Sequence, residues 1–137
     1  MIIFMLDVPE NIHGNNKRFL FIRSLLESRS CTSVLDVGCG NGIHLTAPLA
    51  EAFPQIMFVG IDSDAATMKI AEDFAHKHHL TNTRFCVDAE LNSEEKFDVV
   101  IASEVIEHVE EPGNFLLFLR SKLREGGIII LTTPNGY

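Results

Sequence analysis

The stretch Val34-Leu35-Asp36-Val37-Gly38-Cys39-Gly40-Asn41-Gly42 is an apolar run that stops at three alternating glycines. An apolar run of this kind predicts a buried strand, and glycines directly after it predict a sharp turn. Because Gly38, Gly40 and Gly42 carry no side chains, a ligand can lie against the main chain of this turn. The stretch therefore predicts a strand followed by a ligand-binding loop.

The spacing of these glycines bears on the kind of ligand. A dinucleotide-binding loop has the pattern Gly-x-Gly-x-x-Gly/Ala, whose third small residue packs a helix on the strand, but Ile43 occupies that position here. Asp36 also places a carboxylate where a pyrophosphate would lie, and two negative groups repel each other. The same carboxylate can accept hydrogen bonds from a cationic amino group. The loop therefore favours a nucleoside that carries an ammonium group. A nicotinamide dinucleotide, which would make the protein an oxidoreductase, stays open as an alternative.

Strands and helices are predicted to alternate along the rest of the chain. Helices are predicted at 16–28, at 43–53, after a cap at Asp62 or Ser63, and from Pro112 to about Gly126. Strands are predicted at 33–37, 56–61, 84–87, 97–102 and 128–132. Strands that are apolar on both faces and separated by helices are typical of a parallel sheet covered on both sides. The fold class is therefore α/β, a doubly wound, Rossmann-like parallel sheet.

Ligands of such sheets bind at the carboxyl ends of the strands, where this chain has several polar residues. Asp62 follows the second predicted strand, 20 residues after Gly42, and its carboxylate can accept hydrogen bonds from both hydroxyls of a ribose. The alternative is that Asp62 caps a helix, although Ser63 or Asp64 could do so instead. Asp88 follows the third strand and can accept from an adenine amino group, next to the small Ala89.

Composition limits the classes of partner. The chain has 137 residues and a formal net charge of −8, which disfavours binding to nucleic acid or to an anionic membrane through net charge. Its three cysteines show no metal-ligand spacing and fit a reduced, cytoplasmic setting. The apolar opening at 1–6 is interrupted at once by Asp7, Pro9 and Glu10, so neither a signal peptide nor a membrane span is predicted.

Three stretches, at 34–42, 97–109 and 123–135, resemble the motifs of class I S-adenosylmethionine-dependent methyltransferases in their order and distances. The resemblance covers about residues 17–135 and implies the strand order 3-2-1-4-5. It implies S-adenosyl-L-methionine as the cofactor. It also implies that the residues at the strand ends bind this cofactor: Asp36, Gly38, Cys39, Gly40, Asn41, Gly42, Asp62, Ser63, Asp88, Ala89 and Ser103.

Glu104, Glu107 and His108 follow the fourth predicted strand at positions i, i+3 and i+4, so they would share one face of a short helix there. Ubiquinone-biosynthesis O-methyltransferases and small-RNA 2′-O-methyltransferases resemble this stretch, and the resemblance implies a divalent metal such as magnesium on these three residues. A hard cation could lower the pKa of a substrate hydroxyl. Alternatively, Glu104 and His108 line the pocket as the catalytic residues, with His108 as a general base.

The reaction implied by the resemblance is methyl transfer from a sulfonium to a small-molecule acceptor, at a hydroxyl oxygen. RNA 2′-O-methylation is the alternative within the family, and the acidic charge disfavours it. A module that holds the cofactor without turnover is the alternative of another class. The acceptor itself is not indicated by the sequence.

Family members continue past the fifth strand into a further helix and two strands, whereas this sequence stops at Tyr137. We therefore expect one domain over 1–137, with 1–15 as an N-terminal extension and a sheet that is truncated at its C-terminal side. The last strand, at 128–132, would then lie at an exposed edge of the sheet. Such an edge predicts association, for example as a homodimer.

Overall fold

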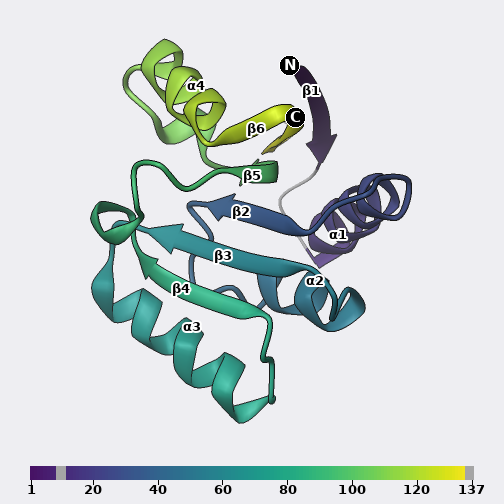
Figure 1. Cartoon of the computed structure of the whole chain (residues 1–137), viewed down its shortest axis with the longest axis vertical. Coiled ribbons are helices and arrows are strands. Elements are labelled where there is room, and N and C mark those ends of the chain that lie inside the picture. Colours follow the sequence, from purple (N-terminus) through teal and green to yellow (C-terminus); the bar gives the residue numbers. More distant parts are fainter. Residues whose placement is uncertain (9–11, 135–137) are drawn as a thin grey trace.

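A computed structural model of the chain describes residues 1–8 and 12–134. In these residues, six strands form one sheet in the order β1-β6-β5-β2-β3-β4, and every neighbouring pair is parallel. Figure 1 shows β1 at one end of the sheet, beside β6, and β4 at the other. The strands are β1 (Ile2–Val8), β2 (Ser33–Val37), β3 (Met57–Asp62), β4 (Thr83–Val87), β5 (Phe97–Ser103) and β6 (Leu123–Pro134).

Helices cover both faces of the sheet. The helices are α1 (Ile12–Glu27), α2 (Thr46–Ala52), α3 (Ala65–Lys77) and α4 (Pro112–Ser121), with short 3-10 turns η1 (Asp88–Glu90) and η2 (Ile106–His108). Buried side chains of α1 and α2 pack with Phe58 on one face, while α4 packs with Val59 and Ile61 on the other, as the alternation of side chains along β3 requires. Within the described ranges, every helix is too short or too polar to cross a membrane.

The predicted fold class is confirmed, and the five predicted strands stand in the predicted order. The prediction that the strand at 128–132 lies at an exposed edge is wrong. Part of the expected N-terminal extension forms an additional strand, β1, which pairs with it. The apolar residues 2–6 pair in parallel with 128–132, from Ile2 opposite Ile128 onward. The edge of the sheet is now β1, where Met5 is 65% exposed. The structural reason for expecting a dimer through β6 is therefore removed.

Four predicted helix boundaries are wrong as well. Helix α1 begins at Ile12 rather than at 16. Helix α2 begins at Thr46 rather than at 43, because the turn after β2 continues to Leu45. Helix α3 is capped by Asp64, whose side chain accepts from the backbone N–H of Thr67; the carboxylate of Asp62 is used elsewhere. Helix α4 ends at Ser121, well before Gly126, because the chain enters β6 directly at Leu123.

One aromatic ring supports the glycine loop from below. Phe85 of β4 belongs to the cluster under α3, and it occupies the space that side chains at two glycines would need. An added Cβ at Gly42 would lie 2.8 Å from the Phe85 ring, and one at Gly60 would lie 2.6 Å from it. The Cβ at Gly60 would also lie 2.8 Å from Sγ of Cys39. The loop after β2 can therefore approach β3 and β4 closely only because these residues are glycines.

This packing predicts that Gly60→Ala destabilises the fold by roughly 1–3 kcal/mol, since the new methyl group overpacks the space that Phe85 and Cys39 fill. The cost should fall on a Phe85→Leu background, which a double-mutant cycle in urea measures. Gly113→Ala is the matched control, because a Cβ there meets nothing within 4 Å. Equal stability of Gly60→Ala and the unaltered chain would contradict this account of the loop.

Candidate functional site

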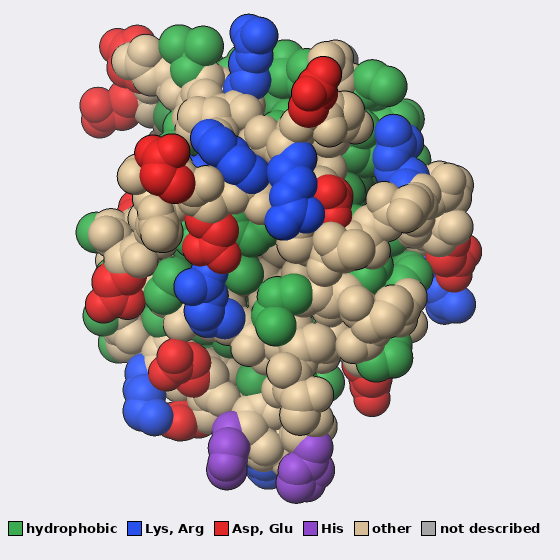
Figure 2. All heavy atoms as spheres, in the orientation of Figure 1, with side chains coloured by type: hydrophobic (Ala, Val, Ile, Leu, Met, Phe, Trp, Pro, Cys, Tyr) green, Lys and Arg blue, Asp and Glu red, His purple; other side chains and the backbone are tan. Residues whose placement is uncertain are grey.

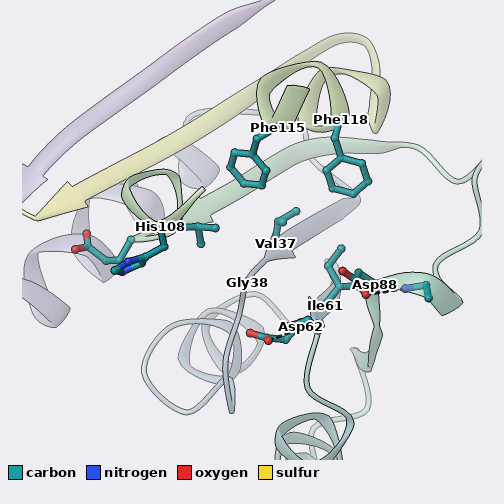
Figure 3. Close-up of a pocket in the computed structure, with 12 residues that line it drawn as sticks. Val37, Gly38, Ile61, Asp62, Asp88, His108, Phe115 and Phe118 are labelled. Atoms are coloured by element: carbon teal, nitrogen blue, oxygen red, sulfur yellow. Dashed lines mark hydrogen bonds between the residues drawn. The ribbon is translucent and has the colours of Figure 1, made fainter. Parts of the chain in front are cut away.

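The carboxyl ends of β2, β3, β4 and β5 lie at one edge of the sheet, and two cavities open there. The larger, of about 800 Å³, is lined by residues that follow each of these strands and by two phenylalanines of α4. Its lining consists of Val37, Gly38, Ile61, Asp62, Ser63, Asp88, Ala89, Glu104, Val105, His108, Phe115 and Phe118. Figure 3 shows His108 at one end and Asp88 at the other, with Phe115 and Phe118 facing Val37 and Ile61.

The smaller cavity, of about 420 Å³, lies over the glycine loop and against α1. It is lined by Asn15, Arg18, Asp36, Gly38, Cys39, Gly40, Asn41, His44, Leu45, Ser103 and Glu104. Gly38 and Glu104 line both cavities, so the two spaces meet at these residues. An elongated ligand can therefore extend from one cavity into the other across Gly38.

The glycine loop has the conformation that the sequence predicts. Gly38, Gly40 and Gly42 all have positive φ, and a Cβ at Gly40 would point into open space with nothing within 4 Å. A side chain at Gly38 would instead collide with Val105, which follows β5, at 2.6 Å. Gly40 is thus the position where the bare main chain faces the smaller cavity, whereas Gly42 packs against Phe85.

Asp62 ties the tip of β3 to this loop. Its Oδ2 accepts the backbone N–H of Gly40 at 3.0 Å, and its Oδ1 accepts the backbone N–H of Ser63 at 2.8 Å. The carboxylate also lines the larger cavity. Oδ1 also accepts the backbone N–H of Asp64 at 3.4 Å. A carboxylate has about four lone-pair positions, so after these three contacts some acceptor capacity remains for a ligand hydroxyl. Asp62 therefore fixes the loop and can also bind a ligand.

Asp36 is the buried carboxylate of the smaller cavity. It is 3% exposed, and its Oδ2 accepts the hydroxyl of Thr46 at 2.6 Å. Burial raises the pKa of Asp36 to about 7; the hydrogen bond from Thr46 opposes this shift and the neighbouring charge of Asp62 adds to it. A cation in the smaller cavity would stabilise the ionised form of Asp36.

The remaining predicted strand-end residues lie at the same edge. Asp88 and Ala89 line the far end of the larger cavity, where Oδ1 of Asp88 accepts the backbone N–H of Ala89 at 2.9 Å. Ser103 lines the smaller cavity. The structure thus brings together all the predicted cofactor-binding positions except Gly42, which lies beneath the loop.

Glu104 lies at the junction of the cavities in an unusual backbone conformation, with φ of 59°. Its Oε1 accepts the hydroxyl of Thr132 at 2.9 Å and lies 3.2 Å from Nη1 of Arg18. Arg18, on α1, also donates to the side chain of Asn15, and its own side chain is 13% exposed. A positive and a negative side chain are therefore fixed side by side at the wall of the smaller cavity.

The prediction that Glu104, Glu107 and His108 share one helical face is wrong. The turn η2 begins at Ile106, and the positive φ of Glu104 directs that residue away from it. His108 Nε2 lies 3.9 Å from Glu107 Oε1, while Glu104 contacts Arg18 and Thr132. Among the residues whose side chains the structure describes, 1–5 and 15–134, no three His, Cys, Asp or Glu side chains come together as a metal site would require.

Several residues of the site were missed by the sequence analysis. Thr132 lies far from the glycine loop in sequence, and Phe115 and Phe118 were assigned only to a helix. Arg18, which precedes the first predicted strand, could from its sequence position either fold over a ligand carboxylate or lie at the surface; the structure places it at the smaller cavity. The i, i+3 spacing of the two phenylalanines gives a signal for a common face, but it does not tell a cavity wall from a core contact. Asn135, the last residue of the resembling stretches, lies outside the described residues.

Comparison with known proteins agrees with this geometry. A family model described as a methyltransferase domain matches residues 10–137. A ubiquinone biosynthesis O-methyltransferase from Bradyrhizobium sp. (strain ORS 278) is 35% identical over 113 residues, which are 80% of this chain and 44% of that protein. The chain thus spans less than half the length of this relative.

Solved structures show the same fold. Coclaurine N-methyltransferase bound to N-methylheliamine and SAH has a TM-score of 0.76 at 18% identity, over 86% of this chain and 35% of that chain. The [4+2]-cyclase SpnF has a TM-score of 0.75 at 24% identity, over 90% of this chain and 49% of that chain. The parallel sheet with its glycine loop defines a Rossmann-like α/β protein. Within that class, this chain belongs to the methyltransferase domain family.

The buried Asp36 predicts a pH dependence of stability. The folded chain holds a proton on Asp36 up to a pKa of about 7, whereas the ordinary value of 3.8 applies when it is unfolded. The stability that this proton contributes is present at low pH, so the free energy of unfolding should fall as pH rises from about 4 to about 7. Asp36→Asn should abolish this fall in the free energy of unfolding, which urea unfolding at each pH measures and which amounts to on the order of 4 kcal/mol for a shift of about three pKa units. An unchanged slope in the variant would contradict the assignment.

Proposed function

We propose that this chain binds S-adenosylmethionine and transfers its methyl group to a hydroxyl oxygen of a small molecule. The observation that carries the proposal is the pair of cavities that meet at Gly38. One cavity suits the adenosine half of the cofactor and the other suits its charged amino acid half. The larger cavity combines apolar walls with the carboxylates of Asp62 and Asp88. The smaller one combines the bare loop at Gly40 with charged groups of both signs.

The adenosine half fits the larger cavity. Asp62 is proposed to accept hydrogen bonds from the ribose hydroxyls, with Ser63 beside it, because its carboxylate lines the cavity and keeps acceptor capacity. Asp88 is proposed to accept from the adenine amino group, with Ala89 leaving room for the base. Val37, Ile61 and the phenylalanines of α4 supply the apolar surface that a purine needs.

The amino acid end fits the smaller cavity. The ammonium group is proposed to lie near Asp36 and Glu104, while Arg18 can pair with the carboxylate. The main chain of Gly38, Cys39, Gly40 and Asn41 and the side chain of Ser103 complete the proposed cofactor site. Gly42 supports the loop from below rather than lining the cavity. A pyrophosphate has no such match, since it would face the carboxylate of Asp36.

When bound, the cofactor supplies a methyl group activated by a positively charged sulfur. The residues of the chain need to hold the acceptor oxygen in line with the bond that breaks and to receive the hydroxyl proton. His108 would receive the hydroxyl proton, because it lies at the end of the larger cavity opposite Asp88. His108 is 76% exposed, so it can exchange this proton with solvent.

The kind of acceptor is proposed from the relatives and from charge. The related protein from Bradyrhizobium is named as an O-methyltransferase of ubiquinone biosynthesis, which supports a small-molecule hydroxyl. The net charge of −8 disfavours the RNA alternative. Lys and Arg side chains are interspersed with Asp and Glu on the face shown in Figure 2. The three cysteines are free thiols, which supports the reduced, cytoplasmic setting that we propose.

Gly40→Val tests the cofactor site directly. The new side chain would enter the smaller cavity, so the affinity for S-adenosylhomocysteine in calorimetry should fall by at least about 10-fold. Gly126→Val is the matched control: Gly126 also has a positive φ and open space, but it lies at the start of β6. It should lose comparable stability and keep the affinity. Undiminished binding by Gly40→Val, or stabilisation of the unaltered chain by NAD alone, would contradict the proposal.

His108→Gln tests the catalytic role. We expect the rate of methyl transfer to a panel of phenols and catechols to fall by about 100-fold, because a general base contributes on this order. The affinity for S-adenosylhomocysteine should stay within about 2-fold. His78→Gln, on the remote end of α3, is the control. Full activity in His108→Gln would remove this residue from catalysis. Cofactor binding without turnover of any acceptor by the unaltered chain would favour a cofactor-binding module.

A further inference from the structure

We propose that Thr132, at the end of β6, is a positioning residue that orients Glu104 and, through it, Arg18 for the amino acid end of the cofactor. The proposal rests on the proposed function, and it assigns a role to a strand that the sequence analysis connected with association. Thr132 is fully buried, so it acts through Glu104 rather than by contact with a ligand.

Thr132 holds Glu104 at two points. Its hydroxyl donates to Oε1 of Glu104 at 2.9 Å, and its backbone carbonyl accepts the N–H of Glu104 at 2.9 Å. The backbone of Glu104 lies in the left-handed region, which is unfavourable for a residue with a side chain. Such a conformation persists only where the surroundings fix it. The two contacts from Thr132 fix both the backbone and the carboxylate of Glu104.

The hydroxyl protons of Ser103 and Thr132 determine which residue donates in each hydrogen bond of this group. A threonine hydroxyl has one proton, and Thr132 gives it to Glu104. Ser103 lies with its Oγ 2.8 Å from Oγ1 of Thr132, so Ser103 is the donor in that pair. The chain of hydrogen bonds therefore runs from Ser103 through Thr132 to Glu104, and each donor strengthens the next. Ser103, the last residue of β5, and Glu104, which follows it, are thereby linked to β6.

Arg18 is the far end of this chain. Its Nη1 lies 3.2 Å from the same Oε1 that Thr132 contacts, while its Nη2 donates to Asn15, so Glu104 and Asn15 together hold the guanidinium. Both side chains line the smaller cavity. Loss of the Thr132 hydroxyl would free the carboxylate to turn and would loosen the guanidinium. The consequence should be confined to the half of the ligand that lies in this cavity.

The test compares two ligands that differ only in the amino acid end. S-adenosylhomocysteine carries it, whereas 5′-methylthioadenosine carries the adenosine and sulfur without it. In calorimetry, Thr132→Val should weaken binding of S-adenosylhomocysteine by about 5- to 10-fold, as loss of one hydrogen bond to a charged group implies, and leave 5′-methylthioadenosine within about 2-fold. Thr132→Ser, which keeps the hydroxyl, should restore the affinity. Thr133→Val, the same change on the opposite face of β6, should have no effect.

A second variant keeps the test independent of any damage to β6. Glu104→Gln retains the shape of the side chain and removes its charge, and it should show the same selective loss for S-adenosylhomocysteine. Equal losses for both ligands in Thr132→Val, or no loss for either, would overturn the positioning role alone. Binding of neither ligand by the unaltered chain would overturn the proposed function, and this proposal with it.

Discussion

The site depends on the close approach of the loop after β2 to β3 and β4. Phe85 fills the space beside Gly42 and Gly60, and the carboxylate of Asp62 accepts the backbone N–H of Gly40 at 3.0 Å. A side chain at Gly60 would push the loop away, and loss of the carboxylate would release it. Because both contacts act on one loop, its bare main chain faces the smaller cavity in a fixed conformation.

The charges at this edge follow from the same constraint. The loop passes over Asp36, whose burial raises its pKa to about 7, and it brings Gly38 against Val105 and next to Glu104. A buried carboxylate of this kind is costly unless a cation or hydrogen-bond donors compensate it. Thr46 supplies one donor, at 2.6 Å. A cationic ligand would supply the remaining compensation. The burial of Asp36 by the fold is therefore consistent with the proposed ligand, which carries an ammonium group.

The fold class could be predicted because it depends on local patterns, and the strand order because three motifs resemble those of a known family. An apolar run followed by glycines, and the acidic residues Asp62, Asp88 and Glu104 at the ends of three strands, indicate the sheet and its ligand-binding edge. The role of residues 2–8 could not be predicted, because an apolar segment does not indicate which strand it will pair with. Thr132 was missed, and Arg18 was left between a surface role and a ligand contact, for a similar reason: the two meet at Glu104 only after α1 and β6 are packed.

The central claim is that one elongated ligand occupies both cavities across Gly38. A crystal structure of the chain with S-adenosylhomocysteine tests it most directly. The account predicts the adenine beside Asp88, the ribose on Asp62, and the amino acid end beside Asp36 and Arg18 in the smaller cavity. A ligand bound away from the carboxyl ends of the strands, or with its amino acid end outside the smaller cavity, would contradict it.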